Sequence, residues 1–241
     1  MRVLVIGSGG REHALVWKLA QECEVHAAPG NPGMHCECHA VAIDDSHGIL
    51  GLSNTLKADL VVVGPEGPLV DGLADLLRTN GFPTFGPGAQ GAKLEASKAF
   101  SKEVMESAGV PTAASLTCTN ASFAIDEVRR MFADGRQVVV KASGNALGKG
   151  VVVCETEEEA IVAIHMMMVD KAFGTAGETV VIEERLIGKE FSLLTLCNET
   201  GYHNLPVAQD YKRIFDGDQG PNTGGMGSYS PVPWVNDDLV S

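Results

Sequence analysis

Basic residues are scarce in this chain. Its 241 residues include 18 Lys and Arg against 31 Asp and Glu, which gives a formal net charge of -13 and a pI of about 4.9. A protein that binds duplex nucleic acid needs a basic face to neutralise the phosphates, and no Lys/Arg cluster supplies one here. We therefore expect no nucleic-acid partner, and the few basic residues beside glycine loops gain weight as site residues.

Long apolar runs, internal repeats and low-complexity tracts are also missing. No apolar run reaches the roughly 20 residues of a membrane-spanning helix, and Arg2 leads directly into a short strand rather than a signal peptide. Two of the six cysteines, Cys154 and Cys197, lie in apolar strand-like segments, where a free cysteine behaves as a small hydrophobic residue. We expect no membrane partner and a reducing, cytoplasmic location.

The chain also lacks the second pair of ligands that a zinc motif requires. Residues 35–39 read His-Cys-Glu-Cys-His, which is five potential metal ligands in a row. Zinc sites normally combine C-x₂-C with a distant second pair of ligands, and the chain has no such pair. We therefore expect a loop and a strand here, and no metal ligand.

The first hundred residues alternate strands and helices. Residues 1–6 form a buried-strand pattern, a glycine turn follows at 7–10, and residues 11–20 favour a helix. Further strands are expected near 25–30, 58–63 and 81–86, and further helices over 69–77 and 89–108. This alternation with short connections predicts an α/β fold with a doubly wound parallel sheet, Rossmann-like in kind. Ligands bind such sheets beyond the carboxyl ends of the strands, where residues 7–11, 31–33 and 64–66 are expected.

The glycine turn is not a dinucleotide fingerprint. G-x-G-x-x-G would require glycine at position 12, where Glu12 stands, and residues 25–30 provide no acidic residue to end the second strand. A dinucleotide-dependent oxidoreductase stays as an alternative of a different class. The turn can still hold a phosphate or carboxylate at the helix N-terminus, with Arg11 beside it.

The pattern changes after residues 109–112, Gly-Val-Pro-Thr, which end a helix whose lysines 93, 98 and 102 suit a solvated face. Strands are expected at 138–141, 150–154, 179–184 and 191–197, the last of them buried, with helices near 121–133 and 156–168. This order predicts a second domain of the α+β class.

The loop between the first two of these strands indicates a phosphate site. Residues 141–150 contain three glycines and two lysines, Lys141 and Lys149, between two β-branched runs. Successive N–H groups in a glycine turn form a concavity that binds anions, and lysine supplies point charges for phosphates. We interpret this loop as a lid over a polyphosphate; an ordinary hairpin loop is the alternative.

Two further stretches are candidates for binding. Glu183 and Glu184 directly follow a buried strand and suit hydrogen bonds to a base or ribose, or else form a solvated strand end. Residues 209–229 are too rich in glycine for a core element. They combine acids, bases and hydroxyls at close spacing, as a polar substrate site requires.

Several stretches together resemble one family, glycinamide ribonucleotide synthetase, also called phosphoribosylamine–glycine ligase. They include MRVLVIGSGGREHAL, VVVGPEGPLV, FGPGAQGAKLEASKAFSK, VVVKASGNALGKGVVV and PVAQDYKRIFDGDQGPNTGGMGSYSPVP. GSGGREHA and GPNTGGMG are specific to this family, and the lysine–glycine-loop–strand pattern is shared with ATP-grasp enzymes in general. The resemblance implies a pre-ATP-grasp domain over residues 1–102. An ATP-grasp domain would cover residues 103–241, with a lid subdomain at about 115–190.

The resemblance also implies an activity. The family uses ATP and Mg²⁺ to join glycine to 5-phosphoribosylamine in purine synthesis, by way of a glycyl phosphate. A carboxylate is a poor electrophile until it is phosphorylated, and a closing lid can keep water from the acyl phosphate. Another ATP-grasp carboxylate–amine ligase, or an inactive nucleotide-binding fragment, is the alternative.

Site residues follow from the resemblance position by position. Contacts with ATP would come from Lys98, Lys141, Gly144, Gly148, Lys149, Gly150, Glu183, Glu184, Leu186 and Glu190. The ribose phosphate of the substrate would face Gly9, Gly10, Arg11, Asn31, Gly33 and Glu66. Glycine, phosphoribosylamine or the transferring phosphate would be bound by the catalytic set Asp210, Lys212, Arg213, Asn222 and Thr223.

Two departures from the family are visible. The lid commonly reads Asp-Gly-Leu-Ala-Ala-Gly-Lys-Gly, whereas here Asn145 and Leu147 replace two of its small or apolar positions. Family members also continue beyond Ser241 with the Glu and Asn that hold Mg²⁺. We therefore expect a fragment or one half of a split enzyme, with little activity alone and a second polypeptide completing the ATP-grasp domain.

Overall fold

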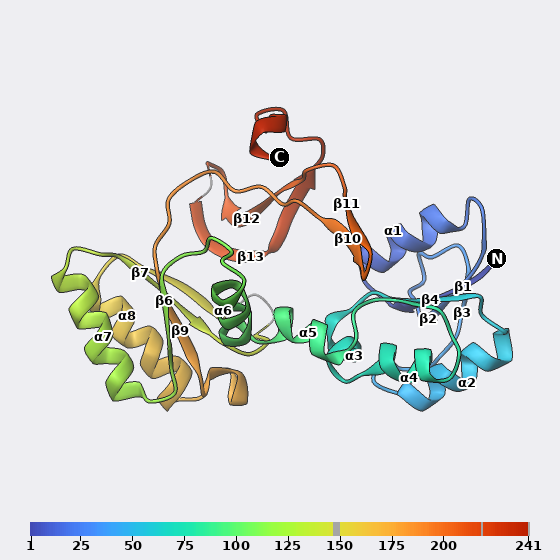
Figure 1. The fold of residues 1–241 in the computed structure, drawn as a ribbon, viewed down its shortest axis with the longest axis horizontal. Coiled ribbons are helices and arrows are strands. Elements are labelled where there is room, and N and C mark those ends of the chain that lie inside the picture. The colour runs from blue at the N-terminus through green and yellow to red at the C-terminus, as the bar shows by residue number, and fades with distance from the viewer. Residues whose placement is uncertain (147–149, 218, 241) are drawn as a thin grey trace. The chain divides into compact units, whose positions relative to one another are not determined.

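A computed structural model describes residues 1–146, 150–217 and 219–240, without the side chains of Pro221 and Asn222. The chain forms two compact units, unit 1 over Met1–Val110 and unit 2 over Pro111–Ser241 (Figure 1). Each is described by itself. No helix of the described ranges is long and apolar enough to cross a membrane.

Unit 1 contains a five-stranded parallel sheet in the order β3-β2-β1-β4-β5. Its strands are β1 (Arg2–Gly7), β2 (Glu24–Pro29), β3 (Glu37–Cys38), β4 (Leu60–Val63) and β5 (Thr84–Phe85). The chain runs outwards from β1 to one edge and then returns to the other side of β1. This confirms the doubly wound sheet expected from the strand–helix alternation.

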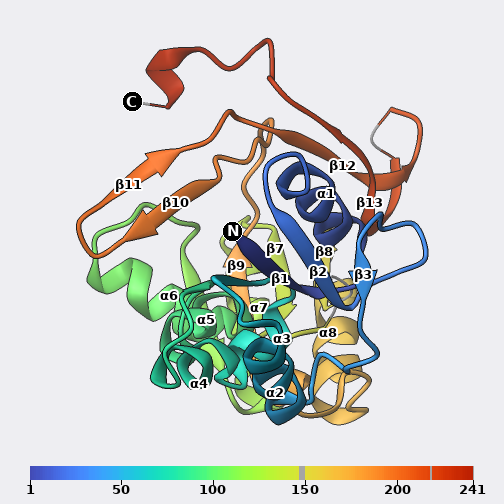
Figure 2. The same cartoon turned by 90° about the vertical axis from the view of Figure 1, so that its right-hand side faces the viewer.

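Alternating side chains of β1 pack into two cores on opposite faces of the sheet. Val3 and Val5 join Val16 of helix α1 (Gly10–Leu19) in one core. Leu4 and Ile6 join the second core, which residues from α2 (Ser46–Leu56), α4 (Leu73–Thr79) and α5 (Ala89–Ala96) complete. Figure 2 shows α1 on one side of the sheet and α2 and α4 on the other. A strand buried on both faces needs the continuous apolar run seen in the sequence.

Two helices expected as continuous are each divided in the structure. Residues 66–79 form α3 (Glu66–Val70) and α4, separated at Gly72, whose φ of 88° is in the left-handed region that favours glycine. Residues 89–107 form α5 and α6 (Lys98–Ser107), separated at Ser97. Ser97 is extended, and its hydroxyl accepts a hydrogen bond from the Phe100 N–H at 3.2 Å, so it caps the second helix.

Unit 2 is built on a four-stranded antiparallel sheet in the order β6-β9-β7-β8. The strands are β6 (Ser115–Cys118), β7 (Val138–Ala142), β8 (Val151–Cys154) and β9 (Val180–Glu184). Helices α7 (Ala121–Ala133) and α8 (Glu157–Ile164), with the π-helical turn η1 (His165–Val169), pack on one face and form its core (Figure 1). A 3-10 turn, η2 (Gly174–Gly177), precedes β9. Helices and strands in this order confirm the α+β class.

The rest of unit 2 consists of two hairpins and a short 3-10 helix, η3 (Asp237–Leu239). The hairpins pair β10 (Thr195–Asn198) with β11 (Gly201–Asn204) and β12 (Gln209–Phe215) with β13 (Gln219–Tyr229). The expected buried strand at 191–197 is wrong: Leu194 is 56% exposed and Leu196 43% exposed. Its loose alternation defined no single apolar face, and β10 pairs within a two-stranded sheet. The glycine-rich segment is an irregular strand of that second hairpin, with register shifts at Arg213.

Candidate active site

A buried glutamate organises the glycine turn of unit 1. Glu12 is 4% exposed, and its Oε2 accepts a hydrogen bond from the Gly9 N–H at 2.8 Å at the start of α1. A Cβ on Gly7 or on Gly64 would lie 2.4 Å from Glu12 Cγ. Only glycine therefore allows the ends of β1 and β4 to enclose this carboxylate. Sequence comparison with a dinucleotide fingerprint treated Glu12 as a mismatch and missed this role.

Arg11 is the cation of the same turn. Its Nε lies 2.9 Å from Glu12 Oε1, and its Nη2 lies 3.6 Å from Glu66 Oε2 at the start of α3. The hydrogen bond with Glu12 raises the pKa of Arg11. The side chain is 62% exposed, so the guanidinium is held in place yet open to an anionic ligand. Gly10 begins α1 immediately before it.

Asn31 and Gly33 complete this group at the carboxyl end of the sheet. The Asn31 side-chain amide donates to the Ser8 carbonyl at 2.8 Å, and its Oδ1 accepts from the Gly33 N–H at 2.9 Å. A Cβ on Gly33 would meet His13 at 3.0 Å. The structure thus brings together the six residues expected to face a ribose phosphate, Gly9, Gly10, Arg11, Asn31, Gly33 and Glu66. Their ligand stays a prediction.

In unit 2, the sheet face opposite α7 and α8 carries a lysine–glutamate pair. Lys141 Nζ on β7 lies 2.7 Å from Glu183 Oε2 on β9. The register pairs Val139 with Glu183, and Lys141 stands two residues further along β7, so both side chains share one face. The side chains of Lys141 and Glu183 are 26% and 8% exposed. A lysine that is mostly buried but still 26% exposed is a suitable phosphate ligand.

Glu184 has a different contact from Glu183. Its Oε1 accepts a hydrogen bond from the Ala114 N–H at 2.9 Å, and its own N–H donates to the Ala114 carbonyl at 2.9 Å. These bonds tie the chain before β6 to the end of β9. Leu186, two residues later, is 69% exposed. The expected adenine contacts of Glu183, Glu184 and Leu186 stay predictions, and Glu184 also has this structural role.

A second lysine brings together three of the predicted residues. Lys212 Nζ on β12 lies 2.8 Å from Glu190 Oε2 and 3.7 Å from Asp210 Oδ1. The hydrogen bond with Glu190 is the main cause that raises the pKa of Lys212. All three side chains are partly or largely exposed. An ammonium between two solvated carboxylates can exchange them for a phosphate at low cost.

The remaining predicted catalytic residues lie on the same hairpin. The Thr223 hydroxyl donates to the Lys212 carbonyl at 2.9 Å and accepts from the Gly225 N–H at 3.0 Å. Arg213 lines a hollow of about 540 Å³ together with Tyr211, Phe215 and Met226. The backbone of Asn222 pairs with that of Arg213; its side chain lies outside the described part of the chain.

The lid loop is described only at its two ends. A Cβ on Gly144 would lie 2.7 Å from Ala176 Cα, and one on Gly150 would lie 2.6 Å from Ala146 Cβ. These two glycines are therefore required by close packing within unit 2, a reason that adds to the expected approach of phosphates. Gly148 and Lys149 lie outside the described residues, as does Leu147. Lys98 begins α6 within unit 1, and its contact with ATP stays a prediction.

Two domain models of one family match the chain from end to end. Residues 1–95 match the phosphoribosylglycinamide synthetase N domain, and residues 96–241 match its ATP-grasp (A) domain. The chain belongs to the phosphoribosylglycinamide synthetase family. The expected domain boundary at 102/103 stays a prediction.

Curated relatives agree with this family. The chain is 48% identical to a phosphoribosylamine–glycine ligase of Xylella fastidiosa, an alignment that covers 99% of this chain and 56% of the relative. It is also 48% identical to the human trifunctional purine biosynthetic protein adenosine-3, covering 99% of this chain and 24% of that protein. The chain thus spans about half the length of the single-function relative.

Solved structures agree on the fold. A phosphoribosylamine–glycine ligase from Thermotoga maritima aligns with a TM-score of 0.74 and 34% identity, over 96% of this chain and 56% of that one. An N5-carboxyaminoimidazole ribonucleotide synthetase from Thermus thermophilus aligns with a TM-score of 0.68 and 21% identity, over 98% and 60% of the two chains. The second likeness concerns the fold alone.

Proposed function

We propose that this chain provides the substrate and nucleotide sites of an ATP-dependent ligase that joins glycine to 5-phosphoribosylamine. The observation that carries the proposal is the consecutive match of both domain models to residues 1–95 and 96–241. The cation-bearing groups at Arg11, Lys141 and Lys212 support it, because all three partners of the reaction are anionic or become so. We infer a reducing cytoplasm as the compartment, supported by six free thiols.

The chemistry asks the protein mainly for positioning and charge neutralisation. An oxygen of the glycine carboxylate attacks the γ-phosphorus of ATP, so that an O–P bond forms and the bond to ADP breaks. The amine of phosphoribosylamine then attacks the carbonyl carbon, phosphate leaves, and the amine loses a proton. We assign Lys141 to the phosphates of ATP and Arg11 to the ribose phosphate of the acceptor. Lys212, released from Glu190 or Asp210, would neutralise the transferring phosphoryl group.

Further residues are assigned to ATP, glycine and Mg²⁺. We propose that Lys98 and the lid residues Gly144, Gly148, Lys149 and Gly150 also contact ATP. Glu183, Glu184, Leu186 and Glu190 would hold the nucleoside, and Asp210, Arg213, Asn222 and Thr223 would line the glycine and phosphoryl end. The ligands for Mg²⁺ would come from the part of the relatives that this chain does not span.

Ligand-dependent thermal unfolding tests the proposal. A ligand that binds only the folded state raises the unfolding midpoint by mass action. We expect a rise with Mg-ATP and none with NAD. Lys141→Met should abolish the rise, whereas Lys171→Met should keep it, because Lys171 forms an exposed pair with Glu178 elsewhere in unit 2. A rise with NAD and not with ATP would reject the ligase in favour of an oxidoreductase.

Activity is tested in a second experiment. The chain is mixed with the complementary part of a relative, and ADP release is followed with glycine and phosphoribosylamine together and with each left out. We expect ADP release that needs both substrates. ATP binding without release under any of these conditions would favour a nucleotide-binding module over a ligase.

A further inference from the structure

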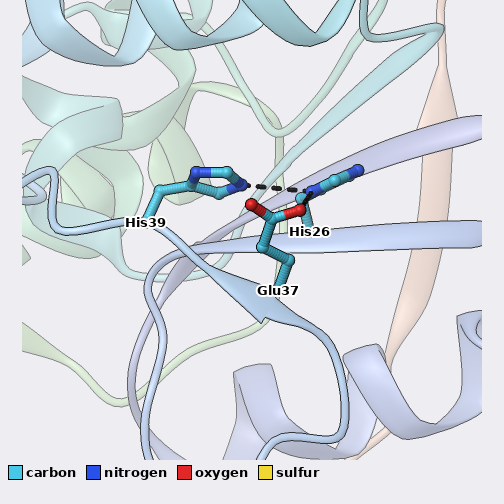
Figure 3. A group of neighbouring side chains, drawn as sticks. All are labelled: His26, Glu37 and His39. Atoms are coloured by element: carbon cyan, nitrogen blue, oxygen red, sulfur yellow. Dashed lines mark hydrogen bonds and ion pairs between the residues drawn. The ribbon is translucent and has the colours of Figure 1, made fainter.

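Three side chains from neighbouring strands meet at one edge of the unit 1 sheet. The register of β2 and β3 pairs His26 with Glu37 side by side on one face. The His39 N–H donates to the Ala27 carbonyl at 2.9 Å, which continues the pairing beyond β3. His39 stands two residues after Glu37 and so returns to the same face. Figure 3 shows the Glu37 carboxylate turned towards both imidazole rings.

The same strand geometry separates the thiols of the His-Cys-Glu-Cys-His segment from this group. Cys36 packs against the core that contains Val16 of α1, and Cys38 pairs in register with Ala27 of that core. His26 instead pairs with Leu4, which belongs to the core on the other face. The segment therefore offers two ligands rather than five, and the third comes from β2. No sequence spacing indicates that third ligand.

The distances suit a transition-metal ion. His26 Nδ1 lies 3.1 Å from His39 Nε2 and 3.6 Å from Glu37 Oε2. One donor atom from each residue lies within 4.8 Å of the other two. Metal–ligand bonds of 2.0–2.2 Å in a tetrahedral zinc site place ligand atoms about 3.3 Å apart. The Glu37 side chain is 69% exposed, so it can move the short distance that remains and leaves an entry path.

A fourth side chain orients the buried ligand. His26 Nε2 lies 3.2 Å from Glu24 Oε1, and Arg2 holds the same carboxylate at 2.9 and 3.2 Å. This contact holds Nε2 on the Glu24 side, so that Nδ1 faces Glu37 and His39. A carboxylate behind a metal-binding histidine is the usual outer partner of such sites.

We propose that His26, Glu37 and His39 bind one divalent late-transition-metal ion such as Zn²⁺. The ligands are His26 Nδ1, His39 Nε2 and a Glu37 carboxylate oxygen, with water in the remaining position. Two imidazoles and a carboxylate are a donor set that zinc accepts and that Mg²⁺ does not favour. The ion would join β2 to the two-residue edge strand β3.

A metal titration of the 241-residue chain tests this proposal. The chain is stripped with a chelator and titrated with Co²⁺, followed by visible absorption, and Zn²⁺ is then added to displace the cobalt. We expect one equivalent of Co²⁺ with visible bands and no intense near-ultraviolet thiolate band. Zn²⁺ should also raise the unfolding midpoint of the stripped chain.

Matched variants separate the ligands from their neighbours. Glu37→Gln and His39→Gln should abolish the visible bands. Glu37 is exposed and His39 is half-buried, so circular dichroism should report an unchanged fold. Glu24→Gln should weaken binding about 10- to 100-fold, as loss of an outer partner does. His35→Gln, and Cys36→Ser with Cys38→Ser, change the same segment and should leave binding intact.

Three results would overturn the site. One is the absence of saturable Co²⁺ or Zn²⁺ binding by the chain, in which case the His26–His39 contact is only a hydrogen bond. Another is a thiolate band that disappears with the cysteine substitutions, which would move the ion to the other face of the strand. The last is unchanged binding by His39→Gln.

Discussion

Two lysine–glutamate pairs of unit 2 have nearly the same length and opposite surroundings. Lys141 Nζ lies 2.7 Å from Glu183 Oε2, and Lys212 Nζ lies 2.8 Å from Glu190 Oε2. The Glu183 side chain is 8% exposed, whereas that of Glu190 is 77% exposed. A buried carboxylate has given up its water and depends on its partner, while an exposed one keeps its hydration.

The difference in burial predicts which lysine stabilises the fold and which one is free to move to a phosphate. Lys141 cannot leave Glu183 without stranding a buried charge, so a phosphate at this position would be an additional partner of the lysine. Lys212 can leave Glu190 or Asp210 for a phosphate, since water replaces it on either carboxylate. We therefore expect substitutions at the first pair to affect folding as well as ATP binding, and those at the second to affect ligand binding with little effect on folding.

The largest expected effect is that of Lys141→Met on the sheet of unit 2. Removing one partner of a buried pair leaves the other charge uncompensated, which costs about 3 kcal/mol. Hydrogen exchange of the β7 and β9 amides measures this as a lower free energy of opening. Lys171→Met is the control, because its pair with Glu178 is exposed on both sides. Equal exchange in the two variants would mean that burial does not distinguish the pairs.

An intermediate effect is expected at the glycine turn of unit 1. Glu12 is buried, but its partner Arg11 is 62% exposed. Glu12→Gln keeps the shape between Gly7 and Gly64 and loses the charge, so we expect about 1 to 2 kcal/mol of destabilisation. Exchange of the α1 amides is the measurement, and Glu22→Gln, at an exposed position after α1, is the control. A cost as large as that of Lys141→Met would show that exposure of the cation is unimportant.

Part of the fold and of the candidate site can be predicted from the sequence. The apolar run Val3–Ile6 and the pattern of glycine turns predict the parallel sheet, because a strand buried on both faces admits few other sequences. The same reasoning placed Arg11, Asn31 and Glu66 at one sheet edge, since parallel strands share their carboxyl ends. In these cases the pattern of the strand and of the turn after it is enough to predict where the residues lie.

Other features depend on which strands become neighbours. Nothing local indicates that Gly64 lies against Glu12, or that His26 lies beside Glu37, because strand pairing decides both. Residues 191–197 were expected to be buried from their apolar content, yet a two-stranded sheet leaves Leu194 exposed. The breaks at Gly72 and Ser97 are single-residue signals within otherwise helical stretches.

A smaller effect on stability is expected for Lys212→Met. Exposed pairs contribute about 0 to 1 kcal/mol, so exchange of the β12 and β13 amides should change little. Binding of phosphoribosylamine or Mg-ATP should weaken clearly, measured by the shift in unfolding midpoint. Asp238→Asn, on the exposed η3, is the comparison at a charged position outside the site. A large loss of stability with unchanged binding would reverse the roles that we give to the two pairs.

The pH dependence of this pair has a definite sign. The folded-state pKa of Lys212 is raised, chiefly by its hydrogen bond with Glu190. Its contribution is therefore complete below the unfolded lysine pKa of about 10.4 and is lost as pH rises through the folded value. We expect the β12–β13 exchange of the native chain and of Lys212→Met to differ slightly at pH 8 and to converge in strong alkali.

Two cysteines on strands allow the same comparison of a buried with an exposed residue. The reaction is the chemical modification of their thiols, and we expect it to have the smallest effect on the free energy of unfolding. Burial raises the pKa of the Cys154 thiol to about 11, whereas Cys197 on β10 is exposed. The thiolate is the reactive form, so a thiol reagent at pH 8 should modify Cys197 rapidly and Cys154 only when the sheet opens. Because β8 pairs with β7, Lys141→Met should accelerate modification of Cys154 and leave Cys197 unchanged. Lys212→Met should accelerate neither, and peptide mass mapping distinguishes the two thiols. Rapid modification of Cys154 in the native chain would mean that the β7–β8 edge opens readily, and the argument that Lys141 is held by a closed sheet would fail with it.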